Sequence, residues 1–527
     1  MPADFPRRDF LRLGSAALLA LHGCGDDGPG LASDSSSDAT TDATTSSTGS
    51  PQLPTTSGPT GDTSTGELDP TTTDVTTTDA TTTDATTTQP VPEDMGTPDD
   101  LCPGEPIAFD PEALPLDLDA FPGALMAGSM RPTSFLFATC CATPGPRLLR
   151  VWRPGERPGS VSLIRELMLE ADADGYLQQL VDGLCPGTWY NYGLFSVDDE
   201  GQPLTRAILC EVRTAPADDV QEPLTVAITS CNGIGNAPWP ALLRTADEYY
   251  DVFLHLGDMA YNDAAVTQAD YRASWKNYLR VDDGEPRGMA LAFSRAGLYC
   301  TLDDHEVTND FNPETIDPAR LKTALTAYFE AIPITDEPQG FRVWRSYRWG
   351  QTAEFIILDC RTERLPSQGQ YLGPEQMAWL KQRLTDSPCH FKIILNSVPI
   401  TNMPNLWDLL AYDRWEGYPE QRSELLGFIN DQAIRNVWFL GGDLHTCFVG
   451  QIQPGSDGVL AKMREIAVTG GNTNPLGNFL PDQQYPFHSS DPHAVVLTFD
   501  PAADEVLVRF IDPETGEDAY AETLTQK

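Results

Sequence analysis

Short apolar runs alternate with amphipathic stretches along the chain after about residue 220. The apolar runs cover 224–230, 252–258, 297–304, 353–360, 391–398 and 437–443, and each has the length of a buried strand. Between them, 317–332 and 373–387 carry apolar residues at helical spacing, with Pro374 near an expected helix start. We also expect a closing hairpin at 494–500 and 505–512. Buried strands that alternate with helices predict an α/β domain.

Residues 105–217 show a different pattern, typical of a small antiparallel β domain. The stretches 148–154, 159–171 and 189–198 are rich in β-branched and aromatic residues, and Gly, Pro and Asp separate them at β-sandwich intervals. The segment LCPGTWYNYGLF (184–195) resembles the turn-and-strand signature of fibronectin type III domains. We therefore expect a fibronectin type III-like β-sandwich before the α/β domain.

The first 24 residues have the order of an export signal. RRDFLRLG (7–14) places Arg7 and Arg8 before the short apolar run SAALLALHGC (15–24). The arginine pair resembles a twin-arginine signal, and LHGC resembles a lipoprotein cleavage box in which Cys24 carries the lipid. A plain secretory signal that contains a cysteine is the alternative. The prediction is an exported lipoprotein, periplasmic or on the cell surface, that uses the twin-arginine export machinery and a membrane lipid anchor.

The segment 25–104 consists mainly of Thr, Asp, Ser, Pro and Gly, and no Lys or Arg occurs between Arg12 and Arg131. It has too little apolar surface to offset its ordering entropy, so we predict a disordered tether. The whole chain has 77 acidic and 34 basic residues, a net charge of −43. This excess argues against nucleic-acid binding through a broad basic surface, but it allows a phosphate ester held by metal ions.

Five of the eleven cysteines lie close together in the sequence of the predicted β region or just before it. They are Cys102, Cys140, Cys141, Cys185 and Cys210. Disulfides form outside the cytoplasm, so this set is a candidate for bridges whose pairing the sequence does not show.

Groups that can bind metals follow five of the predicted buried strands. They are Cys231 and Asn232; Asp258 and Tyr261; Asp303, Asp304, His305, Glu306 and Asn309; Asn396; and Asp443 and His445. One such stretch, LHLGDMAYNDAAV (254–266), could be an ordinary turn. The carboxyl ends of strands in an α/β sheet line the ligand crevice. Five strand ends that all carry metal-binding groups therefore indicate a metal site.

The mixture of ligand types indicates the chemistry. Thiol, phenol, carboxylate, amide and imidazole groups suit a transition metal beside a harder divalent ion. Two adjacent metals can clamp a phosphoryl group and generate a hydroxide near neutral pH. A nearby histidine can then act as a general acid, or donate to a nonbridging oxygen.

Several motifs occur in the order found in one enzyme family. They are GD followed by Tyr, DDHE followed by Asn, LDCRTER, LGPEQMAWLKQRLTDS, WEGYPEQRSELL and GGDLH. Over about 135–520 the chain resembles the PhoD-like alkaline phosphatase/phosphodiesterase family of the metallophosphoesterase superfamily. The segment EVRTAPADD (211–219) resembles the exit from that family's small β domain.

The resemblance implies a four-layer α-β-β-α metallophosphoesterase domain over 218–527, after the β-sandwich at 105–217. It implies hydrolysis of phosphate mono- and/or diesters by a metal-bound hydroxide, with Fe(III) and Ca(II) as cofactors. The implied metal ligands are Cys231, Asp258, Tyr261, Asp304, Asp443 and His445. His305 is implied as the catalytic residue that faces the substrate.

Other residues have weaker or divided assignments. Asn232, Asn309 and Asn396 are candidate ligands or their neighbours, and Asp303 and Glu306 are expected to orient ligands. Arg361 and Arg364 either bind phosphate or pair with surplus carboxylates. Without its neighbouring motifs, Cys231 would be taken as a core residue or half of a disulfide. The alternative function is a catalytically inactive, surface-displayed binding lipoprotein on the same fold, and the preference for mono- or diesters stays open.

Overall fold

The computed structural model describes residues 102, 104–155, 157–281, 287–334, 340–404, 407 and 412–526. The predicted signal with Arg7, Arg8 and Cys24 lies outside the described residues, as does nearly all of the predicted tether. Among the helices of the described part, none is both long enough and apolar enough to cross a membrane.

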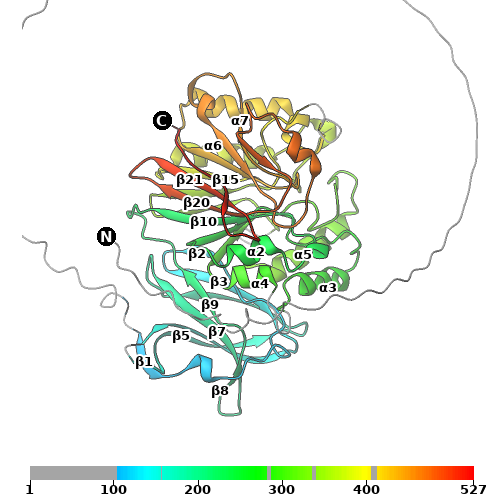
Figure 1. Ribbon diagram of the computed structural model, residues 1–527. Helices are drawn as coiled ribbons and strands as arrows, with labels where there is room; N and C mark the ends of the chain where they lie inside the picture. The colour runs from blue at the N-terminus through cyan, green and yellow to red at the C-terminus, as the bar shows by residue number, and fades with distance from the viewer. Residues whose placement is uncertain are drawn as a thin grey trace, which may run out of the picture. The chain divides into compact units, whose positions relative to one another are not determined.

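Two β-sheets lie against each other at the centre of the fold (Figure 1). One is nine-stranded, in the order β22 (Asp518–Leu524), β21 (Glu505–Ile511), β20 (Ala494–Asp500), β10 (Leu224–Thr229), β11 (Val252–His255), β12 (Gly297–Cys300), β2 (Met126–Arg131), β3 (Ser134–Cys140) and β6 (Tyr176–Asp182). The other is seven-stranded, in the order β13 (Arg345–Trp349), β14 (Ala353–Ile357), β15 (Phe391–Leu395), β16 (Val437–Gly441), β18 (Arg464–Ala467), β17 (Cys447–Gln451) and β19 (Phe487–Ser489).

Alternate residues of each central strand enter different hydrophobic cores. Leu254 on β11 and Phe355 on β14 belong to one core that contains side chains of both sheets, so these faces pack on each other. Their neighbours Phe253 and Ile356 point to the opposite faces, into separate cores. Strands buried on both sides need continuous apolar runs, which explains the sequence pattern.

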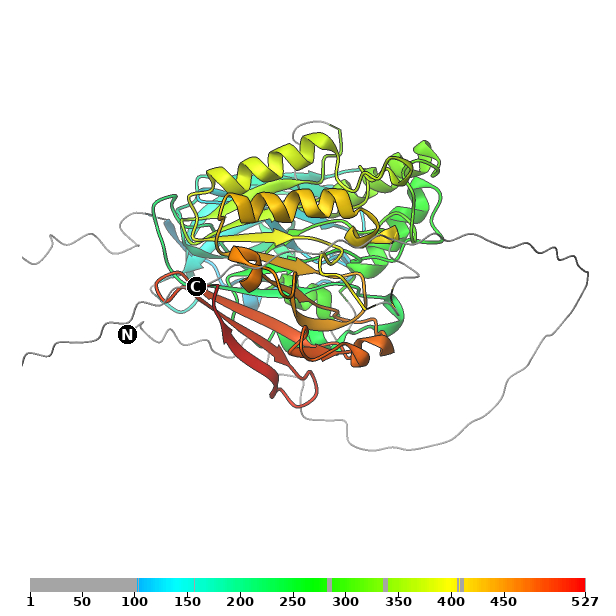
Figure 2. The ribbon, with the colours of Figure 1, turned by 90° about the horizontal axis from the view of Figure 1, so that it is seen from above.

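Helices cover the outer face of each sheet (Figure 1), and Figure 2 looks down on the helices that cover the seven-stranded sheet. Against the nine-stranded sheet pack α2 (Pro240–Thr245), α3 (Gln268–Tyr278), α4 (Gly288–Phe293) and α5 (Pro318–Ala331). Against the seven-stranded sheet pack α6 (Pro374–Asp386) and α7 (Pro419–Asp431). The predicted helix start at Pro374 is confirmed, because this proline occupies the first turn of α6.

The predicted elements of the α/β region are confirmed. The six apolar runs form β10, β11, β12, β14, β15 and β16, and the two helical patterns form α5 and α6. The predicted closing hairpin is the antiparallel pair β20 and β21. The short strands β17, β18 and β19 were not predicted.

The region 105–217 differs from a self-contained β-sandwich. Six of its strands form an antiparallel sheet of their own: β1 (Glu105–Ala108), β4 (Gly145–Pro154), β5 (Ser160–Ala171), β7 (Trp189–Val197), β8 (Pro203–Arg206) and β9 (Cys210–Arg213). The strands β2, β3 and β6 instead extend the nine-stranded sheet, because β2 pairs with β12 at Gly128 and Leu298. The predicted boundary at 217 therefore does not separate two sheets.

Glycines permit this junction. A Cβ atom on Gly128 would lie 2.4 Å from the carbonyl oxygen of Pro333, and one on Gly297 would lie 2.3 Å from the sulfur of Met130. Local sequence patterns predict strands but not the sheet that each strand joins, which is why the continuity was missed. One disulfide joins two of the five clustered cysteines, Cys102 and Cys185, while Cys140, Cys141 and Cys210 are thiols.

Candidate metal centre

The carboxyl ends of parallel strands bring the predicted ligands to one place. The strands β10, β11 and β12 are parallel neighbours, as are β15 and β16 in the other sheet. Hydrogen bonding continues beyond β10 and β11, because the N–H of Cys231 donates to Gly257 and that of Asn232 donates to Asp258. Cys231 and Asp258 are thus held side by side by backbone contacts.

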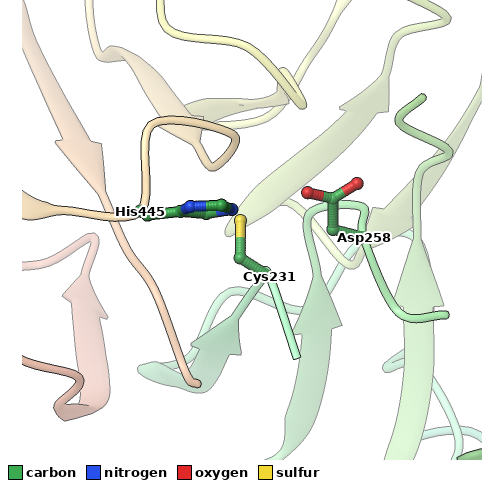
Figure 3. Close-up of side chains that lie close together, drawn as sticks. All are labelled: Cys231, Asp258 and His445. Carbon is green, nitrogen blue, oxygen red and sulfur yellow. The ribbon is translucent and has the colours of Figure 1, made fainter. Parts of the chain in front are cut away.

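Three overlapping groups of side chains have ligand atoms within 4.8 Å of one another. Cys231, Asp258 and His445 form the first and converge from three separate loops (Figure 3). The other groups are Asp258, Asp304 and His305, and Asp303, Asp304 and Asp443. Because Asp258 and Asp304 are each shared by two groups, the three form one continuous cluster.

Tyr261 joins this cluster through its hydroxyl group. The phenol oxygen lies 3.2 Å from Oδ2 of Asp258 and 3.1 Å from Nε2 of His445. The structure therefore brings together all seven residues that the resemblance implied as ligands or catalytic group.

The backbone is left-handed at four of the predicted ligands. The φ angles are 56° at Cys231, 57° at Asp258, 62° at Asp443 and 54° at His445. Such conformations cost roughly 1–3 kcal/mol each in non-glycine residues and cluster at functional sites. The surrounding fold thus holds these side chains in directions that a relaxed chain would not choose.

Gly257 explains how a buried strand leads directly into this cluster. Its φ angle is 100°, and a Cβ atom there would lie 2.5 Å from Cβ of Asp303. Only glycine tolerates both the angle and the close approach. The Gly-Asp pair at 257–258 is therefore a device that turns Asp258 toward the neighbouring strand end.

Glu306 holds the backbone of the two ligand-bearing loops. Its buried carboxylate accepts hydrogen bonds from the N–H groups of Asp258 at 3.2 Å, Met259 at 2.5 Å and Asp303 at 2.8 Å. This position agrees with an orienting role and not with direct ligation.

The cluster concentrates carboxylates away from water. Burial, together with the neighbouring carboxylates, holds the pKa of Asp258 and of Asp443 well above the usual range. Burial also raises the pKa of Asp303 to about 6 and that of Glu306 to about 7. The Oδ2 atom of Asp303 is buried and receives no hydrogen bond from the described residues. A cation at this place would relieve the repulsion and use the free oxygen.

The donor types differ between the two sides of the cluster. Cys231, Tyr261 and His445 offer sulfur, phenol oxygen and imidazole nitrogen, a set that suits a transition metal. Burial raises the pKa of the Cys231 thiol and of the Tyr261 phenol, so each keeps its proton until a bound cation displaces it. Asp258, Asp304 and Asp443 offer only carboxylate oxygens, which suit a harder ion such as calcium.

The sequence left two roles open for Arg361, phosphate binding and ion pairing with carboxylates, and its contacts favour ion pairing. Its buried guanidinium group contacts Asp303, lies 3.4 Å from Asp304, 2.6 Å from Asp413 and 2.8 Å from Asp443. Arg364 binds Asp413 at 2.5 Å and the carbonyl oxygen of Phe311 at 3.1 Å. Both arginines are therefore engaged in pairing surplus carboxylates, and the structure does not present them to a phosphate.

His305 lies at the partly open side of the cluster, with 13% of its side chain exposed. Its Nδ1 atom is 2.9 Å from Oδ1 of Asp263, and its ring packs on Tyr261 with centroids 3.9 Å apart. Burial lowers the pKa of His305, but the hydrogen bond to Asp263 and the charges of Asp304, Asp263 and Asp303 together outweigh burial and raise it overall. Because Asp263 engages Nδ1, Nε2 is the ring atom that can meet a substrate.

The three predicted asparagines have other neighbours. Oδ1 of Asn232 lies 2.9 Å from Nε2 of the core residue His255. Oδ1 of Asn396 accepts from the Cys360 thiol at 3.0 Å and from the Trp415 indole at 3.1 Å. Asn309 is exposed, and its backbone N–H donates to Asp263 at 2.6 Å.

Two residues of the site, Asp413 and Asn472, were not predicted, and Asp263 lay in the predicted stretch 254–266 but was assigned no role. Asp263 stands in the segment YNDAAV, where its spacing from Asp258 resembles an ordinary turn. Asp413 follows no predicted strand. Asn472 follows the strand β18, which was not predicted. A predicted strand there would have identified Asn472 as a residue at a strand end.

The chain is similar to known phosphatases. Residues 226–483 match the model of the PhoD-like phosphatases. Alkaline phosphatase D of Bacillus subtilis (strain 168) is 25% identical over 379 residues, which are 62% of this chain and 61% of that protein. The chain thus aligns with about three-fifths of that relative's length.

Two solved structures share the fold. The structure of PhoD has a TM-score of 0.64 at 20% identity and covers 78% of this chain and 90% of its own. Purple acid phosphatase PPD1 from yellow lupin seeds has a TM-score of 0.56 at 13% identity, over 80% of this chain and 74% of its own.

Proposed function

The chain belongs to the PhoD-like phosphatase family, and on that premise we propose that it is a metal-dependent hydrolase of phosphate esters. The observation that carries the proposal is the convergence of a thiol, a phenol, an imidazole and three carboxylates around Asp258. These residues come from separate strand ends, so their meeting is a property of the fold and not of one local motif.

We assign Cys231, Asp258, Tyr261 and His445 to Fe(III), and Asp258, Asp304 and Asp443 to Ca(II). When bound, such a pair of cations polarises a phosphoryl oxygen and lowers the pKa of an attacking water. The chain's own contribution is to keep the donor atoms close, through the strained loops and the Glu306 carboxylate. Arg361 offsets the carboxylate charge that the cations do not neutralise.

His305 supplies the proton for the departing alcohol. With Asp263 accepting from Nδ1, the protonated ring carries its transferable proton on Nε2. The raised pKa of His305 favours this protonated form relative to an ordinary histidine. Donation to a nonbridging oxygen is the alternative use of the same proton.

We also propose an architecture of two parts. The fold is a four-layer α-β-β-α arrangement, supported by the helices on the outer faces of both sheets. A fibronectin type III-like module precedes it, supported by the antiparallel six-stranded sheet. The strands β2, β3 and β6 tie that module to the catalytic sheet.

The proposed place of action is outside the cytoplasm. Arg7 and Arg8 with the following apolar run support twin-arginine export, and Cys24 supports a lipid anchor. Twin-arginine export passes folded protein, which suits metal loading before export. Export that persists after Arg7 and Arg8 are both changed to Lys would contradict this route.

A panel of chromogenic phosphate mono- and diesters tests the activity, with wild type beside Asp304→Asn. Hydrolysis by wild type that falls at least about 100-fold in Asp304→Asn supports the proposal. The matched control is Asp482→Asn, since that carboxylate is 95% exposed and contacts only His488 among the ion pairs of the described residues. No hydrolysis of any ester by metal-loaded wild type would favour the inactive binding lipoprotein. The same panel distinguishes mono- from diester preference.

A further inference from the structure

One more strand end reaches the cluster, and it carries Asn472. The strand β18 runs parallel to β16, whose end supplies Asp443 and His445. Beyond β18 the segment TGGN (469–472) lies against the loop that follows β10. The N–H of Gly470 donates to Ser230 at 2.8 Å, and the N–H of Asn472 donates to the carbonyl oxygen of Cys231 at 3.0 Å.

Two adjacent glycines make this contact feasible. A Cβ atom on Gly470 would lie 2.0 Å from the Thr229 hydroxyl, and one on Gly471 would lie 3.2 Å from the carbonyl oxygen of Cys231. The segment is therefore packed against the Cys231 loop more closely than side chains would allow. This packing fixes the position of the Asn472 backbone.

The carboxamide of Asn472 reaches two further predicted ligands. Its Nδ2 atom donates to the Tyr261 oxygen at 2.6 Å and lies 3.4 Å from Nε2 of His445. Its Oδ1 atom accepts from Nδ2 of Asn236 at 2.7 Å, which orients the amide with nitrogen toward the site. One residue thus contacts Cys231, Tyr261 and His445.

The Tyr261 oxygen needs such a donor when it binds a cation as phenolate. Ionised Asp258 can only accept hydrogen bonds, so it loses its bond to Tyr261 when the phenol proton leaves. The carboxamide N–H of Asn472 donates whatever the protonation state of its neighbours. A hydrogen bond from outside the ligand set orients a ligand and tunes its basicity.

We propose that Asn472 is a positioning residue of the metal centre: it fixes the Tyr261 oxygen relative to Cys231 and donates a hydrogen bond to the phenolate. This inference rests on the proposed function, because it gives a role to a residue beside the assigned Fe(III) ligands. A purely structural role is the competing view, since the backbone oxygen of Asn472 also accepts from the Thr469 hydroxyl at 2.6 Å.

The test uses the full chain purified with iron, and it records the visible absorption band and the iron retained against a chelator. Asn472→Leu removes the donor with little change in volume. A phenolate without its hydrogen bond is a stronger electron donor, so the band should move to longer wavelength. Iron retention should fall by about 10-fold.

Two further variants make the result specific. Asn236→Leu, at an exposed position, removes only the group that orients the amide, and it should shift the band in the same direction by less. Asn478→Leu is the matched control, because its carboxamide bonds Ser490 and no predicted ligand. If Asn472→Leu fails to fold, Asn236→Leu carries the test.

The outcomes separate this inference from the proposed function. A wild-type band that stays unchanged in both Asn472→Leu and Asn236→Leu would overturn the positioning role and leave the metal assignment intact. An equal shift in Asn478→Leu would also overturn it, because the effect would then come from the loop as a whole. Wild type without iron and without a band would overturn the Fe(III) assignment and this inference together.

Discussion

The Nδ1 atom of His305 lies 2.9 Å from a carboxylate oxygen of Asp263, at the partly open side of the metal centre. The two residues come from different loops, and the N–H of Asn262 donates to the carbonyl oxygen of His305 at 2.9 Å, which holds the loops in register. This pair orients the imidazole and raises its pKa, so it links the shape of the site to the pH range in which His305 can donate a proton.

Asp263→Asn should lower the pH above which the protein loses activity. The raised pKa of His305 means that the protonated donor persists until the pH rises through that pKa. Without the carboxylate the pKa falls, so activity should be lost at lower pH than in wild type. The alkaline limb of the kcat profile measures this, and an unmoved limb would show that His305 is not the group that titrates there.

His305→Asn should lower kcat by roughly 100-fold on esters with poor leaving groups, because general acid catalysis typically contributes 10²–10⁴-fold. Esters with good leaving groups need less protonation and should be affected less. A series of substituted phenyl esters measures the difference. Equal losses across the series would instead indicate that His305 acts on a nonbridging oxygen.

Glu306→Gln should destabilise the fold by about 2–4 kcal/mol, because an amide NH2 would face backbone N–H donors where a carboxylate oxygen accepts now. Chemical denaturation measures the change. Glu424→Gln is a suitable control, since this residue is 49% exposed and, among the described residues, forms an ion pair only with Lys381. A loss of folding stability no greater than in the control would mean that Glu306 does not hold the two loops.

The buried residue His255 should make stability depend on pH. Burial lowers the pKa of His255 to about 3, below the unfolded value near 6.5. The folded state then binds fewer protons, so the contribution is complete above pH 6.5 and is lost as the pH falls toward 3. At pH 5 the loss is roughly 2 kcal/mol.

His255→Leu should therefore be less stable than wild type at pH 7, because Asn232 loses its partner, but it should show a flatter pH dependence between pH 6.5 and 4.5. Denaturant midpoints across that range measure both effects. Parallel pH profiles for the two proteins would assign the dependence to other groups.

The sequence indicated the central strands and most of the cluster because both follow from one rule. Continuous apolar runs mark strands buried on both faces, and their carboxyl ends meet. Cys231, Asp258, Asp304, Asp443 and His445 all follow such runs, so their convergence was predictable. The sequence does not identify Asn472 as a residue at a strand end, because β18 has only four residues and begins with the charged pair Arg464 and Glu465.

Other features depend on contacts between distant segments. Nothing near Arg361 in the sequence shows that Asp413 will lie 2.6 Å away, so its two candidate roles could not be separated. The joining of β2 to β12 depends on close approach at Gly128 and Gly297, which no periodic pattern reveals. Pairing of Cys102 with Cys185 was likewise one choice among several.

Metal analysis with a visible spectrum tests whether Cys231, Asp258, Tyr261 and His445 bind iron. The full chain is purified without chelators, with wild type beside Tyr261→Phe. We expect an equimolar amount of iron in wild type and a visible charge-transfer band that is lost or shifted in the variant. Wild-type protein with neither iron nor a band, or a band unchanged in Tyr261→Phe, would contradict it.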